Sequence, residues 1–284
     1  MKNTLCLIVK DEAAYILEWI AYHRAIGFEN FCIFDNESSD GTRQILVKLA
    51  SQGVIDHWDQ NSIQGSPQRI AYARCIQAYQ GKTDLITFID TDEFIAAPTG
   101  IDVNGHIAAT FDRHPDMAAM ALNWRIFGSS GHEKQAPGLV IERFRHAAKH
   151  PSRTVKTIVR PGNVATMYTH YASLNEGRYG DELGRPVQFE EPKGTPAPGN
   201  IARASASALQ INHYMVKSQE EFSAKSLRGN ANYPAHHPDK YKRFDDKYFT
   251  RYDINEVIDE SAYTLVQKTK NEMQLLYSML GVEA

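Results

Sequence analysis

The stretch Asp84-Leu85-Ile86-Thr87-Phe88-Ile89-Asp90-Thr91-Asp92-Glu93-Phe94 decides the fold, because an apolar run in it ends abruptly in three carboxylates. The run is too short for a core helix and is rich in Ile, Phe and Thr, which is typical of a buried parallel strand. Side chains alternate along a strand, so we expect Asp90 and Asp92 on one face at its C-terminal end. In open α/β sheets, that end of the strands is where ligands bind.

Two carboxylates at such a position repel each other unless a cation lies near them. Oxygen ligands suit Mg²⁺ or Mn²⁺, which can also contact the phosphates of a substrate. We therefore predict a metal site at Asp90 and Asp92. The alternative is that these acids only cap the following helix or face water.

Strand-like and helix-like segments alternate before this stretch. Strands are expected over residues 4–9, 31–34 and 54–58, and helices over about 12–26, 43–52 and 66–79. This order predicts an α/β fold with a mostly parallel central sheet and helices on both faces. Asp35 ends the second strand at the same sheet edge as Asp90, where its carboxylate could accept hydrogen bonds from a nucleotide base or ribose.

Composition limits the class of protein. The 284 residues carry a net charge of −3, which argues against a nucleic-acid partner. Cys6, Cys32 and Cys75 lie in apolar segments without a metal or redox spacing, so we expect reduced core residues. The sequence shows no secretory pattern and no apolar run long enough for a membrane span, so we expect a cytoplasmic protein. Such a protein would meet a lipid acceptor at the inner face of the membrane, as a peripheral protein.

Four segments of the first hundred residues resemble, in order and spacing, glycosyltransferase family 2 and the related family 92 type. They are Val9-Lys10-Asp11-Glu12, then Glu18-Trp19 with His23, then Phe34-Asp35-Asn36 with residues 39–42, and finally residues 89–94. The families usually have Asn where Asp11 stands, and both residues cap helices. The resemblance implies a Rossmann-like A-type glycosyltransferase fold.

The same resemblance implies a domain organisation. Residues 1–230 would form the glycosyltransferase domain, with a nucleotide-sugar half over 1–100 and an acceptor half over 101–230. Residues 231–284 would form a C-terminal helical extension. Its last helix, over about 261–280, has an apolar stripe that we expect to pack on the domain or in a homodimer.

The resemblance also implies roles for individual residues. It places Val9, Asp11 and Glu12 near the nucleotide, Asp35 near the base or ribose, and Asp90 and Asp92 at the metal. A Trp-x-x-Phe-Gly element of the same families is matched by Trp124, Phe127 and Gly128, which are therefore expected at the acceptor. For Trp124, burial in the core is the alternative.

Residues 213–229 resemble the family 92 pattern as well. His213 would complete the metal shell, and cationic side chains would neutralise the departing diphosphate. Those cations are Lys217, Lys225 and Arg228. Lys225 and Arg228 lie three residues apart and would share a helix face, with a solvated basic face as the alternative.

Ser218 and Glu221 predict a capping box at the start of this helix. Residues 175–207 are rich in Gly, Pro, Ala and charge, which indicates either a lid or acceptor loop or a disordered insert. We expect a mobile loop there that closes over the donor. From it we select Asp181 and Glu182 as candidate general bases, with Glu142 also possible.

These observations together predict a glycosyltransferase that uses Mn²⁺ or Mg²⁺. It would move a sugar from a nucleoside-diphosphate sugar, with UDP-sugars first among the donors, to a hydroxyl of a glycan or glycolipid. The resemblance implies inversion and suggests a role in polysaccharide biosynthesis. One alternative is a nucleotidyltransferase, which Lys10-Asp11-Glu12 disfavours because it stands where a Gly-rich loop would be needed. The other is a catalytically inactive sugar-binding module.

Overall fold

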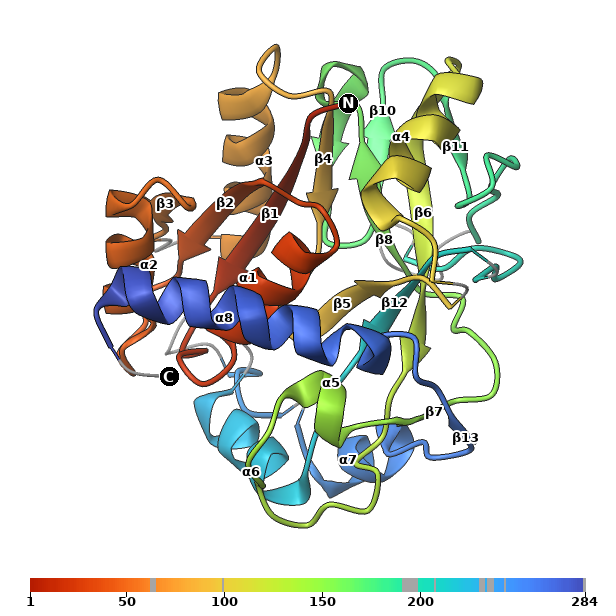
Figure 1. The fold of residues 1–284 in the computed structure, drawn as a ribbon. Helices are drawn as coiled ribbons and strands as arrows, with labels where there is room; N and C mark the ends of the chain where they lie inside the picture. The colour runs from red at the N-terminus through yellow and green to blue at the C-terminus, as the bar shows by residue number, and fades with distance from the viewer. Residues whose placement is uncertain are drawn as a thin grey trace.

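The computed structural model describes residues 1–61, 65–98, 100–190, 199–206, 208–229, 233, 238–242 and 244–282. Within these residues, a nine-stranded sheet forms the centre of the molecule (Figure 1). In sheet order its strands are β3 (Asp56–Asp59), β2 (Asn30–Asp35), β1 (Asn3–Val9), β4 (Leu85–Phe88), β8 (Val155–Val159), β6 (Met117–Ile126), β12 (Gln210–His213) and β5 (Glu93–Ala96), and β11 (Arg178–Gly180) pairs with β6. Two small sheets pair β9 (Val164–Met167) with β10 (Ala172–Leu174) and β7 (His146–Ala147) with β13 (Val257–Ile258).

The N-terminal half of the large sheet is parallel. β1 pairs in parallel with both β2 and β4, and β2 pairs in parallel with β3. The carboxyl ends of these strands therefore meet at one edge, as predicted. In the second half, β8 runs antiparallel to β4 and β6, and β5 runs antiparallel to β12. The α/β prediction is confirmed, with a mixed rather than parallel second half.

Helices cover the sheet and close one end of it. They are α1 (Ile16–Ala25), α2 (Thr42–Ser51), α3 (Pro67–Tyr79), α4 (Val103–Arg113), α5 (Val140–Arg143), α6 (Gln219–Arg228), α7 (Asp246–Tyr252) and α8 (Val266–Leu280), with short 3₁₀ turns at Pro161–Asn163 and Tyr263–Leu265. Figure 1 shows α5, α6 and α7 gathered at one end of the molecule. The second and third helices lie within about a residue of their predicted bounds, whereas α1 begins later than expected.

The late start of α1 corrects the expected capping role of Asp11. Asp11 has a φ of 52°, in the left-handed region, so the chain turns there instead of entering a helix. Its carboxylate Oδ1 accepts a hydrogen bond from the backbone N–H of Ser39 at 2.7 Å. The loop after β1 is thereby tied to the loop after β2, and α1 begins at Ile16.

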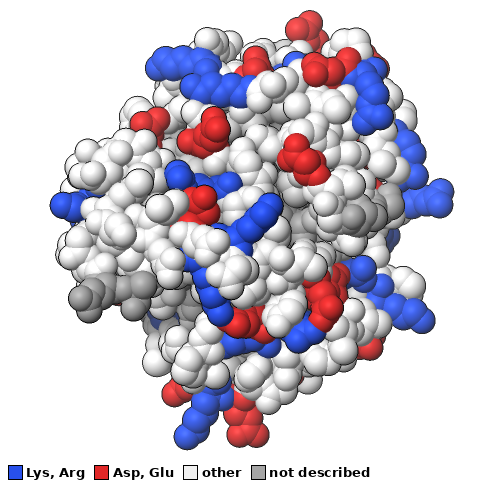
Figure 2. All heavy atoms as spheres, in the orientation of Figure 1, with Lys and Arg blue, Asp and Glu red and all other residues white. Residues whose placement is uncertain are grey.

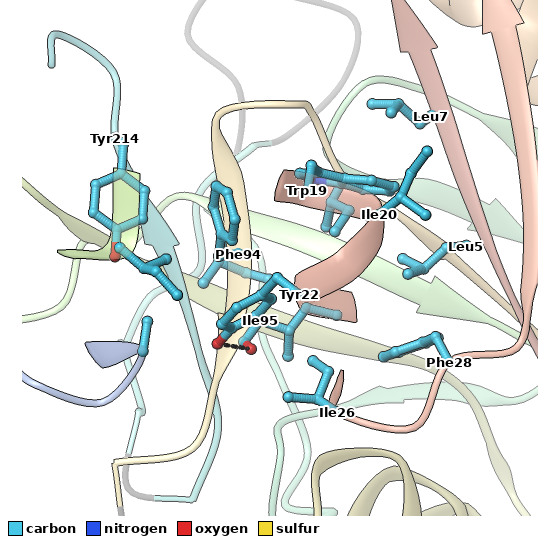
Figure 3. Packing of buried hydrophobic residues seen from close by; sticks show 14 of the residues in the cluster. Leu5, Leu7, Trp19, Ile20, Tyr22, Ile26, Phe28, Phe94, Ile95 and Tyr214 are labelled. Atoms are coloured by element: carbon cyan, nitrogen blue, oxygen red, sulfur yellow. Dashed lines mark hydrogen bonds between the residues drawn. The ribbon is translucent and has the colours of Figure 1, made fainter. Parts of the chain in front are cut away.

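Helix α1 packs its aromatic residues against the turn that carries the predicted metal ligands (Figure 3). Trp19 is fully buried, and its Nε1 donates to the backbone oxygens of Asp90 at 3.1 Å and Glu93 at 2.9 Å. Tyr22, one turn further, donates its hydroxyl to the Ile95 carbonyl at 2.9 Å. Buried Trp and Tyr contribute large apolar areas and usually need such partners. Core packing therefore also fixes the backbone of the turn between β4 and β5.

His23, on the same helix, makes the fold sensitive to acid. It is fully buried, and burial lowers its pKa from 6.5 to about 3. Between these values the unfolded chain binds a proton that the folded chain does not. Stability is therefore complete above about pH 6.5 and falls toward pH 3, by up to about 1.4 kcal/mol per pH unit. We expect His23→Leu to flatten this slope in urea unfolding series across that range, and an unchanged slope would contradict the assignment.

The last helix packs on the N-terminal half. α8 crosses over α1 and also contacts α2 (Figure 1). Leu276 is fully buried, and Glu272 accepts a hydrogen bond from Arg24 Nε at 2.8 Å. The apolar stripe expected on this helix thus lies against the domain.

No helix in the described part of the chain is both long enough and apolar enough to cross a bilayer. On the face shown in Figure 2, cationic and anionic side chains are interspersed.

Candidate functional site

A pocket lies where the carboxyl ends of β1 and β4 meet β12, α6 and the segment around α7. Its lining is rich in charge, with carboxylates facing cations. The charged lining residues are Lys10, Glu12, Asp90, Asp92, Lys225 and Arg228. The uncharged and imidazole lining residues include Val9, Gln68, Trp124, His170, His213, Met215, Phe244 and Tyr248. Residues far apart in the sequence thus converge at the sheet edge that the sequence predicted.

Asp90 is held by buried polar groups from two other elements. Lys156 of β8, whose side chain is 1% exposed, donates to Asp90 Oδ2 at 2.7 Å. Gln68 of α3 donates to Asp90 Oδ1 at 2.7 Å. Burial alone would lower the pKa of Lys156, but the carboxylates of Asp90 and Glu93 raise it, so the ammonium stays charged. The Asp90 carboxylate is therefore oriented before any ligand binds.

Asp92 faces a cation and an imidazole. Lys225 Nζ donates to its Oδ2 at 2.7 Å, and His213 Nε2 lies 3.4 Å from its Oδ1. Burial would raise the pKa of Asp92, but Lys225 and His213 hold it well below its usual value. Burial lowers the pKa of His213, although Asp92 partly opposes this. The Asp92 carboxylate therefore stays charged at neutral pH.

The donor set at Asp92 fits a divalent cation. A carboxylate oxygen and an imidazole nitrogen are ligands that Mn²⁺ accepts. On the far side of the ring, His213 Nδ1 lies 3.7 Å from Glu93 Oε1, and neither atom has a hydrogen-bond partner in the described structure. Metal-bound histidines usually direct their second nitrogen at a carboxylate in this way. Glu93 thus lies near this second nitrogen, at a distance longer than a hydrogen bond.

The three predicted ligands do not form one cluster. Asp90, Asp92 and His213 do not have their donor atoms within 4.8 Å of one another. Groups of three potential ligands that meet this limit occur elsewhere in the described residues. Asp92 and His213 are adjacent, whereas Asp90 turns toward Lys156 and Gln68. The assignment of Asp90 as a metal ligand stays a prediction.

The loop after β1 contributes to the pocket through Val9 and Glu12. Arg228 Nη1 donates to the carbonyls of Lys10 at 2.5 Å and Asp11 at 3.0 Å, and to Glu12 Oε1 at 2.6 Å. Helix α6 is thereby fastened to this loop. Asp11 itself is directed at Ser39 and is not among the lining residues.

Two predicted nucleotide-binding residues lie beside the pocket lining. Asp35 is fully buried at the end of β2, with Arg43 Nη1 3.7 Å from its carboxylate. Lys217 is buried with its Nζ 4.1 Å from the centre of the Tyr15 ring, and burial lowers its pKa. Neither lines the pocket. Their nucleotide contacts stay predictions.

The predicted acceptor residues separate into one pocket residue and two packing residues. Trp124 lines the pocket, with its ring 4.2 Å from that of His213. Phe127 is fully buried against Tyr214, so it cannot contact an acceptor in this conformation. Gly128 lies so close to the C-terminal segment that an added Cβ would be 2.6 Å from the Ile254 carbonyl oxygen. The acceptor role is not supported for Phe127 or Gly128.

Asp181 and Glu182 lie outside the pocket lining, and both stabilise their own loop. Asp181 accepts from the N–H groups of Leu183 and Arg185 and from Arg185 Nε at 2.7 Å. Glu182 is fully buried and accepts from Ser205 Oγ at 2.6 Å. The structure gives no support for a base at either residue, because each carboxylate already accepts hydrogen bonds from groups of its own loop. The remaining candidate, Glu142, is paired with Lys270 at 2.9 Å.

Residues 191–198 and 207 of the expected lid lie outside the described residues.

Several pocket residues were not predicted. The sequence could have indicated Lys156, because a lysine within an apolar strand needs a buried partner of opposite charge. His170 also lines the pocket, and burial lowers its pKa to about 3. Phe244 and Tyr248 come from the C-terminal segment, and nothing local to them indicates the pocket.

Comparisons with known proteins place the chain in a family. Residues 4–192 match the sequence model of glycosyltransferase family 92. A Ricinus communis protein named as a member of that family is 25% identical over 236 residues, covering 81% of this chain and 38% of the relative. An Arabidopsis thaliana protein with the same family name is 23% identical over 241 residues, with coverages of 81% and 38%. The chain thus spans well under half the length of these relatives.

Solved structures show weaker likeness. S. aureus TarS aligns with a TM-score of 0.39 and 19% identity, covering 57% of this chain and 29% of that one. Glucosyl-3-phosphoglycerate synthase from Mycobacterium tuberculosis, in complex with Mn²⁺, UDP-glucose and phosphoglyceric acid, aligns at 0.37 with 11% identity, covering 57% and 58%. The family model, by contrast, matches more than half of the 284 residues. On that match, the chain belongs to glycosyltransferase family 92.

Proposed function

We propose that this chain transfers a glycosyl group from a nucleoside-diphosphate sugar, UDP-sugars first, to a hydroxyl of a glycan or glycolipid, with Mn²⁺ or Mg²⁺. The observation that carries the proposal is the convergence of Asp90 and Asp92 with Lys225 and Arg228 in one pocket. Such a mixture of carboxylates and cations suits a metal-bound diphosphate. Family membership supports the same reaction class.

The residues around Asp92 have distinct roles in this proposal. Asp92 and His213 would hold the cation, which when bound supplies Lewis-acid stabilisation of charge on the leaving diphosphate. Lys225 and Arg228 would donate charge-assisted hydrogen bonds to phosphate oxygens. Both already make such bonds, to Asp92 at 2.7 Å and Glu12 at 2.6 Å. Donor binding would therefore exchange internal carboxylate partners for phosphate.

Trp124 would line the sugar end of the pocket, because an aromatic face packs well against the C–H face of a pyranose. We further propose a single displacement with inversion, in which the acceptor hydroxyl loses its proton to a base. A glycolipid acceptor would bring the protein to the membrane face as a peripheral protein.

A thermal-shift panel tests donor binding. UDP, GDP and CDP are each added with and without Mn²⁺, and we expect UDP with Mn²⁺ to raise the melting temperature most. A ligand at a hundred times its Kd stabilises the native state by about 2.7 kcal/mol, which is several degrees for a chain of this size. Uridine with Mn²⁺ is the control, since it lacks the diphosphate. The absence of a shift with every diphosphate would contradict the proposal.

Turnover separates a transferase from an inactive sugar-binding module. If the metal activates the donor as proposed, water can take the place of the acceptor, so UDP should be released from UDP-sugars in a Mn²⁺-dependent manner. A thermal shift without any release of UDP would favour the inactive module.

A further inference from the structure

All cysteines of the chain meet at one point. The sequence contains three cysteines, and their Sγ atoms lie within 4.8 Å of one another. Cys6 comes from β1, Cys32 from β2 and Cys75 from α3, and each is a free, fully buried thiol. Buried cysteines are common in protein cores, but three sulfur atoms this close to one another form a potential metal site.

The fold explains how they converge. Cys6 and Cys32 are register partners on adjacent parallel strands, so their side chains leave the sheet on the same face. Cys75 of α3 belongs to the same buried apolar cluster as Cys6 and Cys32, which also contains Phe34 and Phe88. The sequence showed no metal spacing because each ligand comes from a different element.

We propose that these three thiols bind one soft monovalent cation, copper(I), through three sulfur atoms. With metal–sulfur distances near 2.3 Å, three sulfurs around one ion would lie about 4 Å apart, which the upper limit of 4.8 Å on their separation allows. Sulfur-only ligands favour copper(I) over hard cations such as Mg²⁺. Structural zinc would need a fourth ligand, and the described cluster contains three.

Tyr79 provides a path to the cluster. Its single hydroxyl proton is donated to Asp56, and the hydroxyl oxygen lies near Cys32. Tyr79 and Asp56 line a surface pocket at the edge of β3, together with Lys82. Rotation of the Tyr79 side chain would open this pocket to Cys32.

The test is an anaerobic titration of the reduced full chain with copper(I), in competition with a chromophoric copper(I) chelator. We expect one equivalent to bind, with a sulfur-to-copper charge-transfer band in the ultraviolet and a raised melting temperature. Cys75→Ser should lose both the band and the stoichiometric binding. His57→Ala should retain them, because His57 belongs to a separate group of potential ligands, with Asp35 and Asp59.

Failure of the native chain to compete with the chelator would overturn the proposal, as would copper(I) binding that persists in Cys75→Ser. Folding of each variant is checked by near-UV circular dichroism. If Cys75→Ser does not fold, Cys6→Ala takes its place. X-ray absorption should show three sulfur neighbours, and two would overturn three-sulfur binding. The result is independent of sugar transfer, since copper binding is measured without donor or acceptor.

Discussion

Asp92→Asn is expected to reduce sugar transfer by about 10²–10³-fold, the usual loss when one preorganised electrostatic group is removed. Asparagine keeps the shape of the side chain but loses the charge that Lys225 and His213 face at 2.7 and 3.4 Å. The variant should therefore hold a divalent cation poorly while it keeps the fold. Initial rates of sugar transfer with Mn²⁺ measure the loss of activity, and near-UV circular dichroism checks that the fold is retained.

Asp116→Asn is the matched control. Asp116 is exposed, lies outside the pocket lining and pairs with Arg178 at 2.6 Å. The same chemical change there should leave the rate at the wild-type value. The Mn²⁺-dependent part of the UDP thermal shift should disappear in Asp92→Asn and persist in Asp116→Asn. A wild-type rate in Asp92→Asn would remove the metal from the mechanism.

The sequence was informative where a local pattern determines the structure. An apolar run that ends in Asp90 and Asp92 predicts their place, because a parallel strand carries its terminal residues to a fixed sheet edge. The capping box was also local: Ser218 Oγ accepts from the Glu221 N–H, and Glu221 Oε2 accepts from the Ser218 N–H. Both predictions required only neighbouring residues.

The predictions that failed or were missed depend on distant residues. Lys156 pairs with Asp90 across two strands, and Phe244 reaches the pocket from the C-terminal segment. Asp181 was expected to be a base because its loop was expected near the acceptor, but its own loop supplies its partners. A local sequence pattern predicts which residues are reactive or charged better than it predicts which partners their side chains contact in the fold.

The pocket depends on the position of α6, because this helix carries the pocket residues Lys225 and Arg228. Arg143 and Glu221 form a buried two-pronged ion pair at its start, with N···O distances of 2.8 and 2.9 Å and side chains 5% and 2% exposed. Tyr15 also donates to Glu221 at 2.9 Å. Position and orientation of the helix therefore depend on this pair.

Arg143→Met is expected to destabilise the chain by about 3–5 kcal/mol, because it leaves the Glu221 carboxylate buried without its cation. Urea unfolding at neutral pH measures the loss. Glu142→Ala is the control: it breaks the exposed pair with Lys270, whose side chains are 32% and 44% exposed, and should cost less than about 1 kcal/mol. The double variant Arg143→Met with Glu221→Leu should be less destabilised than Arg143→Met alone, since no charge then stays buried.

The pH dependence of the same pair has a definite sign. Burial would raise the pKa of Glu221, but Arg143 and Ser218 lower it from 4.5 to about 2. The contribution of the pair is therefore complete above about pH 4.5 and is lost as the pH falls toward 2. Wild type and the double variant should converge in stability over that range. If instead they stay separated by a constant amount down to the lowest pH, the pair does not hold α6 in place.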